Sequence, residues 1–125
     1  MASQHPSLRI MVVDDNRDAA DLVAEFLVMC GHDARPVYGG AEALQTANFF
    51  TPDVVFLDLG MPGIGGIEVA EALRQEPLSV HVKIIALTAW GDEATRAQTK
   101  ASGFNLHLTK PAALAEILGA LDGPG

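Results

Sequence analysis

Residues 54–63, with the sequence VVFLDLGMPG, decide the fold. The apolar run at 54–57 is continuous instead of alternating, and it ends at the carboxylate of Asp58, before a turn rich in glycine and proline. Continuous apolar runs are typical of strands that are buried on both faces of a parallel sheet. Residues 10–13 and 84–87 have the same character, so the three runs predict the central strands of one such sheet.

Helical patterns separate these runs from each other and from two weaker strand candidates, residues 32–37 and 105–108. The helices are expected at residues 19–27, 41–48, 66–74, 92–101 and 114–121. The first carries apolar residues at helical spacing, namely Ala19, Leu22, Val23, Phe26 and Leu27. Gly31 follows as a C-cap. Strands that alternate with helices predict an α/β fold, with a doubly wound five-stranded parallel sheet covered on both sides.

Composition indicates one folded domain. The chain has 125 residues, 49% of them hydrophobic, and we expect a single domain with its core at about residues 8–121. The net charge of −8 argues against nucleic acid or an anionic membrane as a direct partner, because both require cationic patches. The single cysteine, Cys30, cannot form an internal disulfide, and its place late in a helical pattern predicts a small buried thiol.

The sequence contains no secretion or membrane signal. Residues 1–7 are polar, without the apolar region of a signal peptide, and no run of 18 apolar residues occurs. We therefore expect a cytoplasmic protein that does not enter a membrane.

Charged and hydroxyl side chains follow the predicted strands where each one ends. Asp14 and Asp15 come after the first strand, Asp58 after the third, Thr88 after the fourth and Lys110 after the fifth. Ligands of open α/β sheets bind outside the carboxyl ends of the strands, so these side chains are expected to meet. Three carboxylates repel one another unless a divalent cation neutralises them. An all-oxygen site with few protein ligands suits Mg²⁺.

The other groups of this cluster suit a phosphoryl group. The Lys110 ammonium is a point charge for phosphate oxygens, and the Thr88 hydroxyl can donate a hydrogen bond to another oxygen. Phosphoryl transfer depends mainly on positioning and charge neutralisation. An aspartate can itself be the nucleophile and form an acyl phosphate. Asp58 is the best candidate, because it stands alone after the central third strand.

Four motifs in register resemble the receiver domain of two-component response regulators. They are Asp14-Asp15, residues 54–66 around Asp58, Ala86-Leu87-Thr88-Ala89 and Leu108-Thr109-Lys110-Pro111. The resemblance covers residues 9–121 and implies the (βα)5 flavodoxin-like topology, with strand order 2-1-3-4-5. Residues 88–91 and 103–108 also resemble the receivers of hybrid sensor histidine kinases.

The resemblance implies a phosphoacceptor and a metal site. Asp58 would take a phosphoryl group from the phosphohistidine of a histidine kinase. Asp15 would bind Mg²⁺ directly and Asp14 would help through water, while Asp58 and the backbone carbonyl of Gly60 would complete the protein ligands.

The resemblance also implies phosphoryl-contacting and switch residues. Lys110 would contact the phosphoryl group and form a cis peptide bond with Pro111. Thr88 would swing inward on phosphorylation, and Ala89 would leave room for the phosphate. Receivers often carry Tyr or Phe three residues before the lysine, as a second switch residue. This chain has His107 there, which is either an ordinary edge-strand histidine or a switch residue.

Partners follow from the same resemblance. A sensor histidine kinase, in another chain or in the same parent chain, or a phosphotransfer protein would supply the phosphoryl group. A downstream protein partner would bind a changed surface, which we expect on the fourth helix, fifth strand and fifth helix. The domain would support its own phosphorylation and dephosphorylation without being a turnover enzyme.

Gly60 and Trp90 occupy positions that the family uses to tune the lifetime of the phosphoryl group.

Other functions remain open at this stage. A flavodoxin-like nucleotide or flavin binder has the same architecture, but it requires a glycine- or hydroxyl-rich loop after the first strand, where this chain has carboxylates. A phosphohydrolase resembling the haloacid dehalogenase family requires Asp-x-Asp, and the second position here is Gly60. A receiver-like interaction module that is never phosphorylated is the third alternative.

Overall fold

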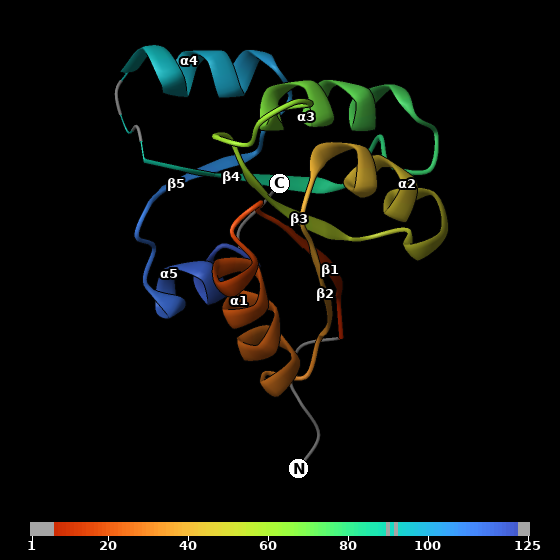
Figure 1. The fold of residues 1–125 in the computed structure, drawn as a ribbon, viewed down its shortest axis with the longest axis vertical. Coiled ribbons are helices and arrows are strands. Elements are labelled where there is room, and N and C mark those ends of the chain that lie inside the picture. The colour runs from red at the N-terminus through yellow and green to blue at the C-terminus, as the bar shows by residue number, and fades with distance from the viewer. Residues whose placement is uncertain (1–6, 90, 92, 123–125) are drawn as a thin grey trace.

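The structure, a computed structural model, describes residues 7–89, 91 and 93–122, and it contains one parallel sheet between two layers of helices (Figure 1). The strands are β1 (Arg9–Val13), β2 (Asp33–Val37), β3 (Val54–Asp58), β4 (Lys83–Thr88) and β5 (Leu106–Thr109). The helices are α1 (Arg17–Met29), α2 (Gly40–Phe50), α3 (Gly66–Gln75), α4 (Glu93–Ala101) and α5 (Leu114–Gly119). The strands pair in the order β2-β1-β3-β4-β5, which confirms the predicted doubly wound topology.

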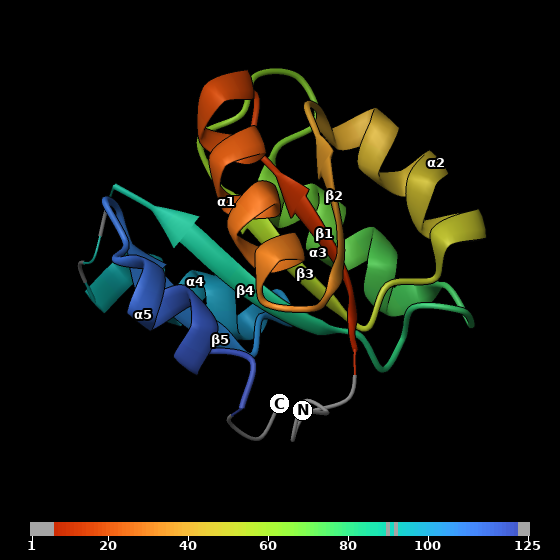
Figure 2. The same ribbon diagram turned by 90° about the horizontal axis from the view of Figure 1, so that it is seen from below.

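The helices divide between the two faces of the sheet. Helices α2, α3 and α4 cover one face, and α1 and α5 cover the other (Figure 1). The view from below shows α1 and α5 in front of the strands (Figure 2). Because alternate side chains of a strand point to opposite faces, the sheet has two separate cores. Met11 and Val55 belong to the core on the α2–α3 side, whereas Ile10 and Val54 belong to the core on the α1–α5 side.

The continuous apolar runs form the central strands, as predicted. All residues of β3 are buried, and so are all but the first residue of β1 and of β4. The edge strands β2 and β5 are only partly buried, in keeping with their weaker sequence patterns. Burial on both faces holds β1, β3 and β4 in the centre of the sheet. The polar residues that directly follow these strands are therefore held at one edge of the sheet.

Two details of burial on α1 differ from the prediction. Leu22 is 60% exposed, because α1 packs on the sheet through Ala20, Ala24 and Leu27. The two alanines are small and allow the helix to approach the sheet closely. The apolar stripe is wider than the buried face, so spacing alone could not tell which residues lie inside. Cys30 is only partly buried, because it is the C-cap of α1, where the chain turns away at Gly31 with a φ of +99°.

The last two helices also differ in their bounds. Helix α4 begins at Glu93, and Asp92, the first residue expected in it, lies outside the described residues. Helix α5 ends at Gly119, two residues before Leu121, which packs against the α1–α5 core from beyond the helix. Within residues 7–89, 91 and 93–122, no helix has the length and hydropathy to span a bilayer.

Candidate functional site

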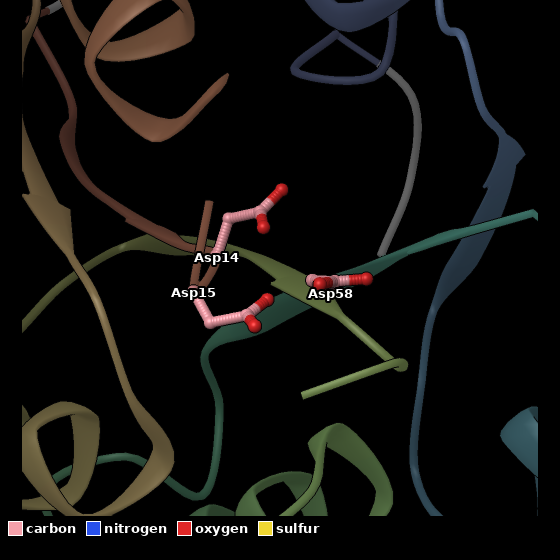
Figure 3. Close-up of side chains that lie close together, drawn as sticks. All are labelled: Asp14, Asp15 and Asp58. Atoms are coloured by element: carbon pink, nitrogen blue, oxygen red, sulfur yellow. The ribbon is translucent and has the colours of Figure 1, made fainter. Parts of the chain in front are cut away.

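The polar residues singled out in the sequence lie at the carboxyl end of the sheet. Asp14 directly follows β1, Asp58 is the last residue of β3, Thr88 is the last residue of β4, and Lys110 directly follows β5. The side chains of Asp14, Asp15 and Asp58 lie close together in Figure 3. Parallel pairing brings these strand ends to one edge, which is where ligands of open α/β sheets bind.

Three carboxylates form a cluster that can hold a cation. One carboxylate oxygen from each of Asp14, Asp15 and Asp58 lies within 4.8 Å of the others (Figure 3). Asp14 and Asp58 are buried, at 3% and 6% exposure, whereas Asp15 is exposed. Carboxylate oxygens are hard ligands, and a set of three with one open side fits Mg²⁺, which keeps several waters. Zinc sites in proteins typically contain Cys or His ligands, and this cluster of three aspartates has neither.

Lys110 joins two of these carboxylates. Its Nζ lies 3.0 Å from Asp14 Oδ2 and 3.1 Å from Asp58 Oδ1. Burial by itself lowers the pKa of Lys110, but the hydrogen bonds and charges of Asp14 and Asp58 outweigh that effect and raise the pKa above its usual value of 10.5. The ammonium is therefore charged at neutral pH. The peptide bond between Lys110 and Pro111 is cis, the isomer that the resemblance implied.

Backbone donors hold the two buried carboxylates in place. The N–H of Asn16 donates to Asp14 Oδ1 at 3.0 Å, and the N–H of Gly60 donates to Asp58 Oδ1 at 3.1 Å. Asn16 itself caps α1, because its side chain accepts from the N–H of Ala19 at 3.1 Å. Lys110 Nζ and the N–H of Gly60 thus both contact Oδ1 of Asp58.

The loop after Asp58 passes very close to the strand end. A Cβ atom at Gly66, the first residue of α3, would lie 2.6 Å from the carbonyl oxygen of Asp58 and 3.0 Å from Leu59 Cα. A side chain at this position would therefore force the backbone to move, because the start of α3 lies against the backbone that carries Asp58.

A cavity of about 270 Å³ opens beside Asp58. Thr88, at 2% exposure, and Lys110 line it together with Asp58, so the structure brings these three predicted residues around one space. Ala89 lies at the exposed part of the wall. The complete lining consists of Asp58, Leu59, Gly60, Ile67, Thr88, Ala89, Thr95, Gln98 and Lys110.

Four residues of this lining were not predicted as site residues, namely the apolar Leu59 and Ile67 and the polar Thr95 and Gln98. Thr95 and Gln98 lie on α4, and their three-residue spacing puts them on one side of the helix. The sequence of α4 is polar and alanine-rich, so no apolar stripe indicates which side packs on the sheet. When the side of a helix that faces a cavity is polar, apolar periodicity in a single sequence cannot identify it.

His107 does not line the cavity beside Asp58. It lines a separate cavity of about 480 Å³ between α4 and β5, with Arg96 and Lys100. In the sheet, His107 is paired with Ala86, two residues before Thr88, so His107 and Thr88 project from the same face of adjacent strands. Trp90, predicted to affect phosphoryl lifetime, lies outside the described residues.

Comparison with known proteins agrees with this site. The family model "Response regulator receiver domain" matches residues 10–122. The chain belongs to the response regulator receiver domain family. The transcriptional regulator RpaA of Synechocystis is 33% identical over 110 residues, which are 88% of this chain and 46% of that protein. The response regulator DivK of Brucella anthropi is 26% identical over 102 residues, covering 82% of this chain and 83% of that protein.

Solved structures of receivers superpose closely on this one. The chemotaxis response regulator CheY4 of Vibrio cholerae has a TM-score of 0.89 at 27% identity, covering 93% of this chain and 97% of that one. A response regulator of Burkholderia pseudomallei, solved with a phosphorylated aspartic acid, a calcium ion and citrate, has a TM-score of 0.85 at 28% identity. That match covers 93% of this chain and 67% of that one.

The family fixes the general role of the domain. Receiver domains are signalling modules of two-component systems, they typically bind Mg²⁺ at an acidic pocket, and they interact with histidine kinases or phosphotransfer proteins. They are not turnover enzymes on external substrates. Because the chain belongs to the receiver family, a flavin-binding module and a phosphohydrolase are no longer supported as alternatives. This receiver spans less than half the length of several of the curated relatives that it matches, and RpaA is described as DNA-binding.

Proposed function

We propose that this receiver domain accepts a phosphoryl group on Asp58, in the presence of Mg²⁺, from the phosphohistidine of a histidine kinase or phosphotransfer protein. The observation that carries the proposal is the position of Lys110 Nζ, 3.1 Å from Asp58 Oδ1 and beside the three clustered carboxylates. A fixed cation next to a buried carboxylate suits the transfer of a dianionic group.

In the proposed reaction, the nucleophile is Oδ2 of Asp58. It forms a bond to phosphorus while the P–N bond of the phosphohistidine breaks, and the electron pair of that bond returns to the imidazole nitrogen. Lys110 and the Thr88 hydroxyl contact phosphoryl oxygens within the cavity. The small side chain of Ala89 leaves room for the phosphoryl group in the cavity. The same site then supports loss of the phosphoryl group, without a turnover reaction on an external substrate.

The metal ligands of the proposal are Asp14, Asp15, Asp58 and the backbone carbonyl of Gly60. The three carboxylates meet the requirement for oxygen ligands on one side of an ion. When bound, Mg²⁺ offsets the negative charge that gathers between the carboxylates and the phosphoryl group.

Phosphorylation is proposed to change a protein-binding surface on α4, β5 and α5. Thr88 is the primary switch residue, and His107 is the second, which is supported by their common face of the sheet beside α4. The downstream partner is a protein. The net charge of −8 supports the absence of direct contact between these residues and nucleic acid or membrane.

Residues 1–125 form one receiver domain in this proposal, with the core at about residues 8–121. The kinase is a separate chain or part of the same parent chain. Because phosphohistidine is made from ATP, the proposed location is cytoplasmic.

Intact-mass analysis tests the proposal. The protein is incubated with Mg²⁺ and acetyl phosphate beside Asp58→Asn, a chelated sample and the control Asp33→Asn, which alters an exposed carboxylate on β2. We expect an adduct of one phosphoryl group that needs both Asp58 and Mg²⁺ and persists in the control. No adduct in a sample that still binds Mg²⁺ would contradict the proposal and favour a receiver-like module that is never phosphorylated.

A further inference from the structure

The cavity beside Asp58 has polar residues at its buried end, whereas two of the three exposed residues in its described lining are glycine and alanine. The groups that contact a phosphoryl group, Asp58 and Thr88, are buried at 6% and 2% exposure. Among its described lining residues, three are exposed, namely Gly60, Ala89 and Gln98. Glycine and alanine carry no functional group, so Gln98 is the one of these three exposed residues that has a polar side chain.

Hydrolysis of an acyl phosphate requires that water attacks phosphorus from the side opposite the leaving oxygen. In phosphoryl transfer the attacking oxygen and the leaving oxygen lie roughly in line with phosphorus. Here the leaving oxygen belongs to Asp58, which is buried. The attacking water must therefore approach from the side opposite Asp58, and Gln98 is an exposed residue of the cavity lining.

The chemistry of a carboxamide fits this position. Its C=O oxygen can accept a hydrogen bond from water, while its NH₂ group can donate to a phosphoryl oxygen. A neutral group does so without adding negative charge beside a dianion. Thr95, three residues before Gln98 on α4, lines the same cavity from the same side of the helix.

We propose that Gln98 orients the water that hydrolyses the phosphoryl group on Asp58, and so sets how long this receiver stays phosphorylated. The inference rests on the proposed function. In the reaction, the water oxygen forms a bond to phosphorus and the P–Oδ2 bond of Asp58 breaks. The electron pair returns to the carboxylate, and both water protons leave with the product, dihydrogen phosphate.

The experiment measures the decay of phosphorylated protein. The wild type, Gln98→Ala and Gln98→Met are phosphorylated with acetyl phosphate and Mg²⁺, freed of donor by gel filtration, and followed by intact mass. Methionine matches the length of glutamine and lacks its hydrogen-bonding groups, so it separates a role in orienting water from a role in filling space. Gln45→Ala, an exposed glutamine on α2, is the matched control.

We expect both Gln98 variants to lose the phosphoryl group about five- to tenfold more slowly than the wild type, the effect of one hydrogen bond in the transition state. Gln45→Ala should decay at the wild-type rate, and all variants should keep the wild-type Mg²⁺ affinity, because none of them alters a clustered carboxylate. Wild-type decay in Gln98→Met, or faster decay in Gln98→Ala, would overturn the inference and leave the proposed function intact. A wild type that takes no phosphoryl group would overturn both.

Discussion

The guanidinium of Arg74 donates two hydrogen bonds to the carbonyl oxygen of Gly103, at 2.9 Å from Nε and 2.7 Å from Nη2. It also donates to the carbonyl of Val82 and, at 2.8 Å, to the side-chain oxygen of Asn105. Burial lowers the pKa of Arg74 from its usual value. A single side chain at the end of α3 thus connects the segment before β4 to the turn between α4 and β5.

Replacement of Arg74 is predicted to destabilise the fold. Arg74→Leu removes the guanidinium and takes this donor away from the carbonyl oxygens of Gly103 and Val82. The free energy of unfolding should therefore fall by about 2–3 kcal/mol in urea titrations. Arg74→Lys should recover less than half of the loss, because lysine cannot reach several acceptors in one plane. Arg96→Leu is the control, since the hydrogen bond from Arg96 Nε to the carbonyl oxygen of Gly91 is exposed. A loss below about 0.5 kcal/mol in Arg74→Leu would contradict this role.

The ion pairs of Lys110 predict a dependence of stability on alkaline pH. The pKa of Lys110 is higher in the folded protein than in the unfolded chain, so its contribution is complete below about pH 10.5 and is lost as the pH rises through the folded value. In metal-free buffer, the wild type should therefore be more stable than Lys110→Met at pH 8, and the difference should shrink above pH 10.5.

The measurement is urea unfolding between pH 8 and 11.5, in a Tyr38→Phe background. That background is needed because the pKa of Tyr38 is also raised, chiefly by its hydrogen bond to Asp21. Parallel stability curves for the two proteins across this range would show that Lys110 is not bound to the carboxylates as described.

Mg²⁺ is predicted to stabilise the folded protein through the three clustered carboxylates. A ligand that binds only the folded state, at 100 times its dissociation constant, adds about 2.7 kcal/mol to the free energy of unfolding. Asp15→Asn should lose most of this gain, whereas Asp18→Asn, in the exposed first turn of α1, should keep it. Calorimetric titration and thermal unfolding with and without Mg²⁺ measure both effects, and equal stabilisation of the two variants would place the ion elsewhere.

A methyl group at Gly66 is predicted to disturb both the fold and the site. Gly66→Ala puts a Cβ atom 2.6 Å from the carbonyl oxygen of Asp58, so the backbone must move, at a cost of about 1–3 kcal/mol. Phosphorylation by acetyl phosphate should slow at the same time, because Asp58 shifts away from Lys110. Gly119→Ala, where the added atom meets nothing within 4 Å, should be neutral or slightly stabilising. A Gly66→Ala protein with wild-type stability and phosphorylation would refute this prediction.

The sheet and the centre of the site could be predicted from the sequence because their signals are local. A continuous apolar run such as residues 54–57 is compatible with few structures other than a doubly buried strand, and a parallel sheet brings the residues after such strands together. Asp14, Asp58, Thr88 and Lys110 could therefore be assigned to one edge without knowledge of any contact.

The exposure of Leu22 and the presence of Gln98 in the cavity could not be predicted in this way. The apolar stripe of α1 has more members than the sheet can cover, and the depth of packing is decided by Ala20 and Ala24. The side of α4 that faces Asp58 is polar, so hydropathy does not mark it. The role of His107 stays a prediction, because its cavity adjoins α4 and not the phosphoacceptor.

The close approach of Gly66 to Asp58 also limits how the loop between β3 and α3 can change in evolution. An insertion near Gly66 would push directly on the backbone of the phosphoacceptor. At Gly63, in contrast, an added atom meets nothing within 4 Å, although the φ of +72° still favours glycine. Length variation among homologues should therefore be concentrated at the tip of the loop, and an engineered sensor or affinity tag inserted into this segment has its best chance of tolerance there.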